Sequence, residues 1–213
     1  MVKVSKGDLV RFEYSGKIAS SGYIFDTTDE SIAKKAGIHD ASAIYGPKLA
    51  VFGTRAIIAG VEEAISTVEL GQHQEFHIPS DKAFGKRLPE LIRMIPEKEF
   101  FSQQVRPVPG MVVALDNMLA RVKSVTSGRV VVDLNHPLAG EDVVYSVKVH
   151  EVISDDQKKI EAILASHALS SAKVSKDAKG FSVAFKKSDD KDKVESAKRI
   201  ISAVVEKTSF STS

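Results

Sequence analysis

Hydrophobic and polar residues alternate in several stretches of the chain, a pattern typical of half-buried strands. In residues 2–14, Val10, Phe12 and Tyr14 share one face, and charged residues occupy positions between them. The same alternation predicts further strands at residues 23–25, 74–78 and 143–149. The last of these strands needs sheet partners, and the most similar patterns precede Gly85. The first domain is therefore expected to be discontinuous.

Helical spacing replaces this alternation at three places. Residues 61–68 carry apolar side chains at i, i+3, i+4 and i+7, which predicts a short amphipathic helix that Gly71 ends. Near the C-terminus the pattern predicts a helix near 160–168, two strands near 174 and 181–185, and a helix over 194–205. Residues 155–213 are thus expected to form a small α+β domain whose polar tail, 208–213, is frayed.

The pattern of residues changes directly after Gly85. Prolines recur through residues 86–109, at Pro89, Pro96, Pro107 and Pro109. Residues 111–115 and 128–132 then have the pattern of paired strands, with Met118 and Leu119 between them. We expect residues 86–135 to be a separate small unit, inserted between residues 1–85 and 136–153 of the first domain.

Several short motifs have the spacing of one protein family. Tyr14 and Gly16 are followed by the pair Phe25-Asp26, and Ala83-Phe84-Gly85 comes far downstream. Between them lie Ile57, Ile58, Gly60 and Val61, and Tyr145 lies in the predicted strand after the insert. An insertion directly after Gly85 that returns through Asn135-His-Pro-Leu-Ala-Gly140 completes the pattern. Over residues 1–153 the chain resembles the FKBP-type peptidyl-prolyl cis-trans isomerases, in particular the SlyD-like branch with an insert-in-flap chaperone domain and its long archaeal members.

The resemblance implies an α+β fold, in which an antiparallel sheet wraps on a short helix, with an inserted β-rich domain and a C-terminal α+β domain. It also implies an isomerase site with no cofactor and no metal. The implied catalytic residues are Tyr14, Asp26, Ile58 (through its backbone N–H), Phe84 and Tyr145. The implied walls of the prolyl pocket are Phe25, Ile57 and Val61. Two departures matter: Phe84 lacks the hydroxyl of the family's tyrosine, and Val61 makes the pocket floor shallower.

The insert is rich in apolar residues for about fifty positions. Methionines among them suit an adaptable surface that accepts many unfolded sequences. The residues proposed to bind unfolded chains, about half of which are expected to belong to the insert's own core, are Ile92, Met94, Ile95, Phe100, Phe101, Met111, Val112, Leu115, Met118 and Leu119.

Composition excludes several other classes of protein. The absence of cysteine excludes disulfides and thiol catalysis, and a net charge of +2 is too small to indicate a nucleic-acid partner. No apolar run is long enough to span a bilayer, and the N-terminus lacks the apolar core of a signal peptide, so we expect a cytoplasmic protein. His73 and His77 stand four apart, but in a predicted strand they are expected to be surface residues and not metal ligands.

The sequence therefore predicts an isomerase whose partners are unfolded or partly folded polypeptides that contain proline. Two alternatives stay open. The chain could be a non-catalytic chaperone whose pocket has decayed, and Phe84 and Val61 are the residues that favour this alternative. It could also be a scaffold whose main function lies in the C-terminal domain, through homodimerisation or ribosome contact.

Overall fold

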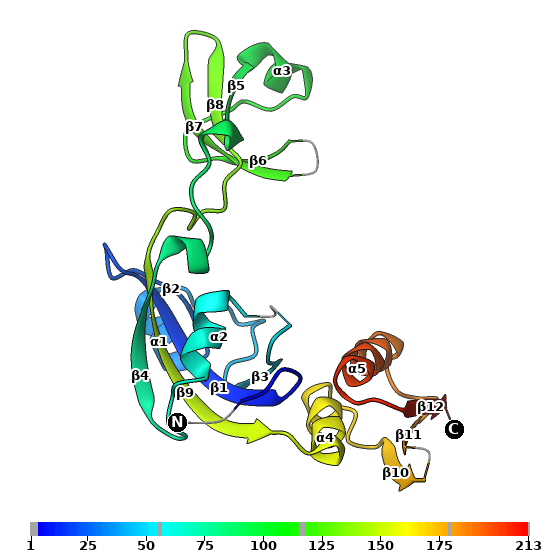
Figure 1. The fold of residues 1–213 in the computed structure, drawn as a ribbon. Helices are drawn as coiled ribbons and strands as arrows, with labels where there is room; N and C mark the ends of the chain where they lie inside the picture. The colour runs from blue at the N-terminus through cyan, green and yellow to red at the C-terminus, as the bar shows by residue number, and fades with distance from the viewer. Residues whose placement is uncertain (1–3, 55–56, 116–117, 179, 213) are drawn as a thin grey trace. The chain divides into compact units, whose positions relative to one another are not determined.

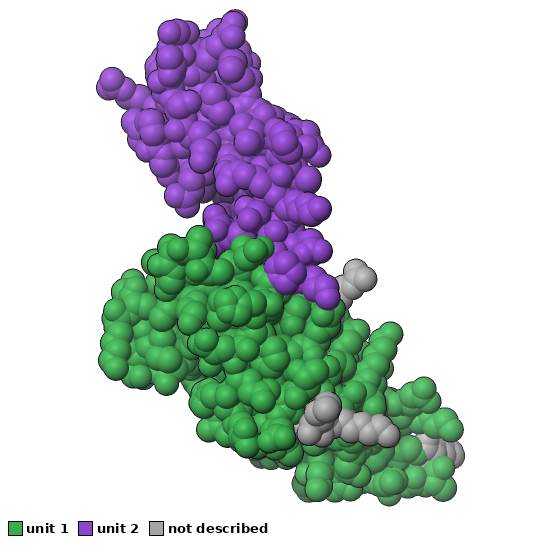
Figure 2. All heavy atoms as spheres, turned by 60° about the vertical axis from the view of Figure 1, so that its left-hand side comes forward, with its two compact units in different colours: residues 1–78, 142–213 green, residues 79–141 purple. Residues whose placement is uncertain are grey.

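The computed structural model describes residues 4–54, 57–115, 118–178 and 180–212. They form two compact units, which Figure 2 colours separately. Unit 1 comprises residues 1–78 and 142–213, and unit 2 comprises residues 79–141. The predicted insert, 86–135, lies inside unit 2, and the predicted C-terminal domain, 155–213, lies inside unit 1.

Unit 1 is built on an antiparallel five-stranded sheet (Figure 1). Its strands are β1 (Leu9–Ile18), β2 (Ile24–Thr27), β3 (Lys48–Val51), β4 (His73–Ile78) and β9 (Val143–Ile153). Strand β1 is central, because β9 pairs along one of its edges while β2 and β3 pair along the two halves of the other. Strand β4 pairs on the far edge of β9, so the expected partners of residues 143–149 are confirmed.

Two short helices accompany this sheet, α1 (Glu30–Ala36) and α2 (Ala59–Ile65). Helix α2, which was predicted over residues 61–68, packs against β4 and β9 and buries Val61 and Ile65. Strand β1 begins later than the alternation predicts. Gly7 adopts a left-handed φ of 89°, and the Asp8 N–H donates to the Ser5 carbonyl at 3.0 Å, so a turn precedes Leu9.

The rest of unit 1 packs on the end of this sheet. Its elements are α4 (Asp156–Ser166), β10 (Lys173–Asp177), β11 (Gly180–Phe185), α5 (Lys191–Val204) and β12 (Thr208–Thr212). The helices and strands predicted here are present, but the expected frayed tail is wrong. Strand β12 pairs parallel to β11, because α5 returns the chain to that edge and the Phe210 ring stacks 6.3 Å from the Phe185 ring.

Unit 2 contains a four-stranded antiparallel sheet in the order β5-β8-β7-β6. Its elements are η1 (Ser80–Lys82), η2 (Pro89–Leu91), β5 (Ile92–Pro96), α3 (Glu97–Ser102), β6 (Val112–Leu115), β7 (Met118–Thr126) and β8 (Arg129–Asp133). The predicted pairing of residues 111–115 with 128–132 is wrong, because β7 lies between them. Ser127 and Gly128, with φ of 48° and 73°, form a two-residue turn that joins β7 directly to β8. Sheets and helices together confirm the predicted α+β class.

Candidate functional site

The register of the central sheet gathers the predicted site of unit 1 around Gly16. On β1, Gly16 lies opposite Asp26 of β2 on one side and Tyr145 of β9 on the other. Tyr14 lies two residues along β1 and so faces the same side of the sheet. Three strands from distant parts of the sequence thus meet at one point, and each contributes a predicted site residue.

Tyr14 and Asp26 are joined by a hydrogen bond. The Tyr14 hydroxyl donates to Asp26 Oδ2 at 2.7 Å, and the carboxylate lies on the exposed edge of the site. Thr28 fixes the backbone of Tyr14: its hydroxyl accepts from the Tyr14 N–H at 2.9 Å, and its own N–H donates to the Tyr14 carbonyl at 2.9 Å. The ring is therefore held at both ends, by its backbone and by its hydroxyl.

Aromatic rings surround this hydrogen bond. The Tyr14 ring lies 5.7 Å from the ring of Phe12 and 5.8 Å from the ring of Tyr145, measured between centroids. The ring of Phe25 meets Tyr145 edge-on at 5.8 Å. A Cβ on Gly16 would lie 2.7 Å from the Phe25 ring, so the absence of a side chain there makes room for these rings.

The electrostatics of the site keep both tyrosines neutral. Burial raises the pKa of the Tyr14 hydroxyl above its ordinary value of about 10, and the hydrogen bond to Asp26 raises it further. Burial also raises the pKa of Tyr145, and the nearby charge of Asp26 acts in the same direction. Tyr14 is thus a hydrogen-bond donor throughout the physiological range of pH.

The remaining predicted wall residues of unit 1 lie at the start of α2. Ile58 is the residue before the helix, and no described residue accepts a hydrogen bond from its N–H. Val61, in the first turn of α2, is fully buried, whereas Ile57 is half-buried. The role of the Ile58 N–H as a donor to a substrate carbonyl stays a prediction.

Phe84 belongs to unit 2, whereas the other predicted catalytic residues belong to unit 1. That Phe84 contributes to the same site therefore stays a prediction. Within unit 2, the Phe84 ring stacks on His136, with centroids 4.7 Å apart and planes inclined by 2°. The Gly140 N–H donates to the Gly85 carbonyl at 2.8 Å nearby. The segments before and after the predicted insert therefore lie next to each other at Gly85 and Gly140.

The apolar residues predicted to bind clients divide into two groups in unit 2. Phe100 is buried in its core, and Ile95, Met111 and Leu115 are half-buried against that core. The others are exposed, by 39% to 72% of their surface: Ile92, Met94, Phe101, Val112, Met118 and Leu119. Phe100, although only 5% exposed, also lines a hollow of about 340 Å³ with Ile95, Met111, Val112 and Leu115.

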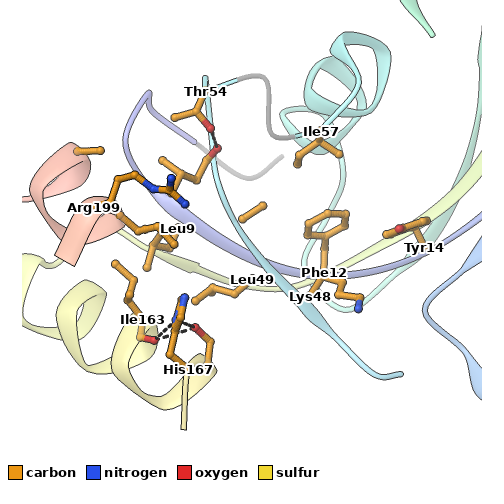
Figure 3. A pocket seen from close by; sticks show the side chains of 15 residues that line it. Leu9, Phe12, Tyr14, Lys48, Leu49, Thr54, Ile57, Ile163, His167 and Arg199 are labelled. Atoms are coloured by element: carbon orange, nitrogen blue, oxygen red, sulfur yellow. Dashed lines mark hydrogen bonds between the residues drawn. The ribbon is translucent and has the colours of Figure 1, made fainter. Parts of the chain in front are cut away.

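An elongated hollow of about 460 Å³ begins at the aromatic site of unit 1 (Figure 3). Tyr14, Phe12 and Ile57 line it at one end. Its other end is formed by side chains of α4 and α5, among them Arg199, and by His167, which directly follows α4. The hollow is therefore lined both by the five-stranded sheet of unit 1 and by its C-terminal helices.

Sequence reasoning missed Phe12 and Thr28 as site residues. Phe12 has the alternation of a core residue, and its contact with Tyr14 depends on the register of β1. Thr28 follows Asp26 by two positions, in a stretch that the sequence reads as a turn or helix cap. Asp29 is the cap of α1, accepting the Ile32 N–H at 3.0 Å, and Thr28 is the residue that holds Tyr14.

Metal binding and membrane insertion find no structural support in the described residues. None of the His, Asp or Glu side chains there form a group of three or more that could hold a metal ion. His73 and His77 lie in β4 with exposed side chains. No helix of the described part of the chain is long and apolar enough to cross a membrane.

Comparison with known proteins finds relatives of one kind. A family model described as FKBP26, IF domain, matches residues 93–138, within unit 2. The FKBP-type peptidyl-prolyl cis-trans isomerase SlyD of Helicobacter pylori is 28% identical over 120 residues, covering 55% of this chain and 63% of that protein. The FKBP-type 16 kDa peptidyl-prolyl cis-trans isomerase of Escherichia coli is 27% identical over 110 residues, covering 50% and 74%. A crystal structure of the three FKBP domains of wheat FKBP73 aligns with a TM-score of 0.37 and 14% identity over 72% of this chain and 41% of that one, a likeness too slight to support an argument.

A further relative matches more than two thirds of the chain. The short-type peptidyl-prolyl cis-trans isomerase of Methanocaldococcus jannaschii is 32% identical over 149 residues, which are 70% of this chain and 94% of that protein. Identity at this level across nearly the whole of a relative shows that the chain belongs to the FKBP-type peptidyl-prolyl cis-trans isomerase family.

Proposed function

We propose that this chain catalyses cis-trans isomerisation of prolyl peptide bonds in unfolded or partly folded polypeptides. The observation that carries the proposal is the Tyr14–Asp26 hydrogen bond of 2.7 Å, whose Tyr14 ring lies in a cluster with the rings of Phe12, Phe25 and Tyr145. The family membership of the chain supports the same activity.

The chemistry requires little more than a dry, apolar site. Rotation about a prolyl bond has a barrier of about 18–20 kcal/mol, which arises from amide resonance. Water stabilises the polar, planar ground state, so moving the bond among aromatic rings favours the less polar, twisted transition state. Each tenfold acceleration needs about 1.4 kcal/mol of this differential stabilisation. No covalent intermediate and no cofactor are needed.

The polar groups of the site orient the substrate. The Ile58 N–H would donate to a substrate carbonyl at the start of α2. Asp26 holds the Tyr14 hydroxyl by a single hydrogen bond, so the ring presents the same face to each substrate. Since Tyr14 stays protonated, turnover is expected to vary little between pH 6 and 9.

The exposed apolar residues of unit 2 would capture clients for this site. Leu119, Met94 and Phe101 expose 72%, 59% and 53% of their surface, and flexible methionine suits clients of varied sequence. The match of residues 93–138 to the FKBP26 IF domain supports a role of its own for this unit.

Turnover of a proline-containing tetrapeptide tests the catalytic proposal. Tyr14→Ala and Asp26→Ala should each lower the rate constant by about tenfold or more, because each removes the hydrogen bond that orients the ring. Tyr23→Ala is the matched control, since Tyr23 lies 54% exposed outside the cluster of rings. Parent rates in both site variants would show that the pocket is assigned wrongly. No acceleration by the wild-type chain would instead favour the non-catalytic chaperone.

A further inference from the structure

We propose that the hollow between the sheet of unit 1 and its C-terminal helices is a second binding site for the same client chain. It would take a client segment that carries an acidic side chain about four or five residues from the proline. This inference rests on the proposed function and adds to it a preference for client sequence.

The hollow shares Tyr14 and Phe12 with the aromatic cluster. Tyr14, Phe12 and Ile57 line its near end, and Leu49 of β3 lies further along (Figure 3). Val51 of the same strand also lines the hollow. A client held at Tyr14 therefore has a lined path along β1 and β3 for its next residues.

The length of this path sets the position of the acidic residue. Leu9 lines the far part of the hollow and Tyr14 the near end, five residues apart on β1. With a rise of about 3.4 Å per residue, that separation is about 17 Å. An extended client covers the same distance in about five residues.

The charged residues that line the hollow are of one sign. None of the 15 residues that line it carries a carboxylate, whereas Lys48 and Arg199 are cations. His167 is engaged at both ring nitrogens: its Nδ1 donates to the Ile163 carbonyl at 2.9 Å, and its Nε2 lies 3.2 Å from the Ser196 hydroxyl. An acidic side chain is the complement of these charges.

Arg199 is the cation best placed to receive it. Its guanidinium points from α5 into the hollow in Figure 3. Among the described residues no carboxylate pairs with it, whereas its neighbour Lys198 pairs with Glu195 at 2.8 Å. Lys48 is already engaged, since its Nζ donates to the Ile44 carbonyl at 2.7 Å.

The two walls of the hollow are held together by a shared core. Leu9 of β1 and Ile153 of β9 are buried in the same cluster as Ile163 of α4 and Ile201 of α5. A buried ion pair adds to this contact, with Lys159 Nζ 3.6 Å from Asp8 Oδ1 and both side chains less than a tenth exposed. A client can therefore bind without first ordering the two walls.

Peptide affinity measured with the full chain tests the proposal. Fluorescent ten-residue peptides with one proline would carry Glu, Gln or Lys at the fourth or fifth position before it, or after it. When the substituted residue lies on one particular side of the proline, the Glu peptide should bind about three- to fivefold more tightly than the Gln peptide. The Lys peptide should bind more weakly than the Gln peptide. Raising the salt concentration should remove this difference. Arg199→Glu should reverse the order of affinity, whereas the matched control Lys193→Glu, on an exposed position of the same helix, should keep it.

Several results would overturn the proposal. Equal affinity of the wild-type chain for all three peptides at every position would do so, and this arm needs no variant to fold. A preference for Glu that persists in Arg199→Glu would place the acidic site elsewhere. A dimer of the wild-type chain that Arg199→Glu dissociates would assign the hollow to a second copy.

Turnover of a tetrapeptide, which is too short to reach Arg199, separates the two proposals. Wild-type turnover without any preference for Glu would reject the second site alone. Absence of turnover would reject the proposed function, and the second site with it.

Discussion

The two units use aromatic and aliphatic side chains in opposite ways. In unit 1, Tyr14 and Tyr145 are packed against other rings, and Asp26 fixes the Tyr14 hydroxyl. In unit 2, Met94 and Leu119 are more than half exposed. A site that acts on one chemical bond needs fixed walls, whereas a surface that meets many unfolded sequences needs apolar area without a fixed shape.

Adjacent phenylalanines in α3 allow the largest test of this difference. Phe100 is 5% exposed and Phe101 is 53% exposed. Phe100→Ala should destabilise unit 2 by about 3–5 kcal/mol, because it opens a cavity in a small core. Phe101→Ala should change the stability by less than about 0.5 kcal/mol but weaken the binding of an unfolded client. Urea unfolding and client-binding titrations of both variants provide the check, and equal destabilisation by the two would contradict the division into core and surface.

A double substitution on the exposed face should have the next largest effect. Met94→Lys with Leu119→Lys removes two apolar contacts, each worth about 1.5 kcal/mol when fully buried by a client. Affinity for an unfolded client should fall by about a hundredfold. Titration with a permanently unfolded protein measures it. The matched control is Lys98→Ala with Glu97→Ala, on the charged start of α3. If the control weakened binding as much as the double substitution, the exposed face would not be the capture surface.

Tyr145 offers a smaller effect, confined to alkaline pH. Its pKa is raised in the folded chain, whereas the unfolded chain ionises near pH 10. The folded state is thus stabilised by neutral Tyr145 below that pH, and this stabilisation is lost relative to the unfolded chain as the pH rises above about 10. Between pH 10 and 11 the wild-type chain should lose about 1 kcal/mol more than Tyr145→Phe. Urea unfolding at pH 8, 10 and 11 measures the difference, and parallel losses in the two chains would show that the hydroxyl is not buried.

Sequence patterns predicted the first sheet better than the second. The alternation in residues 143–149 is long and regular, and its partners β1 and β4 carry the same pattern, so the discontinuous sheet could be inferred. In unit 2, several short apolar stretches follow each other, and their order in the sheet depends on the turn at Ser127 and Gly128. Polar residues 208–212 form β12 only because α5 delivers them beside β11. Local pattern could not predict these two pairings, since each depends on tertiary contacts.

The sequence predicted which residues gather at the candidate site, but it did not predict the contacts that hold them there. Tyr14, Asp26 and Tyr145 were identified by their resemblance to a family, and the structure brings all three together around Gly16. Phe12 and Thr28 have no separate signal in the sequence, because their roles depend on the register that places them beside Tyr14. The hollow that reaches Arg199 likewise depends on packing between segments far apart in the chain.

The proposed division of labour between the units is tested most directly by measuring two activities on the same two variants. One variant is Asp26→Ala, and the other replaces residues 86–135 with a short glycine linker, which the contact between Gly85 and Gly140 makes feasible. Tetrapeptide turnover and proline-limited refolding of a protein substrate should both fall in Asp26→Ala. The deletion should lower only the refolding rate and spare tetrapeptide turnover. Equal refolding rates for the deletion and the wild-type chain would contradict the account.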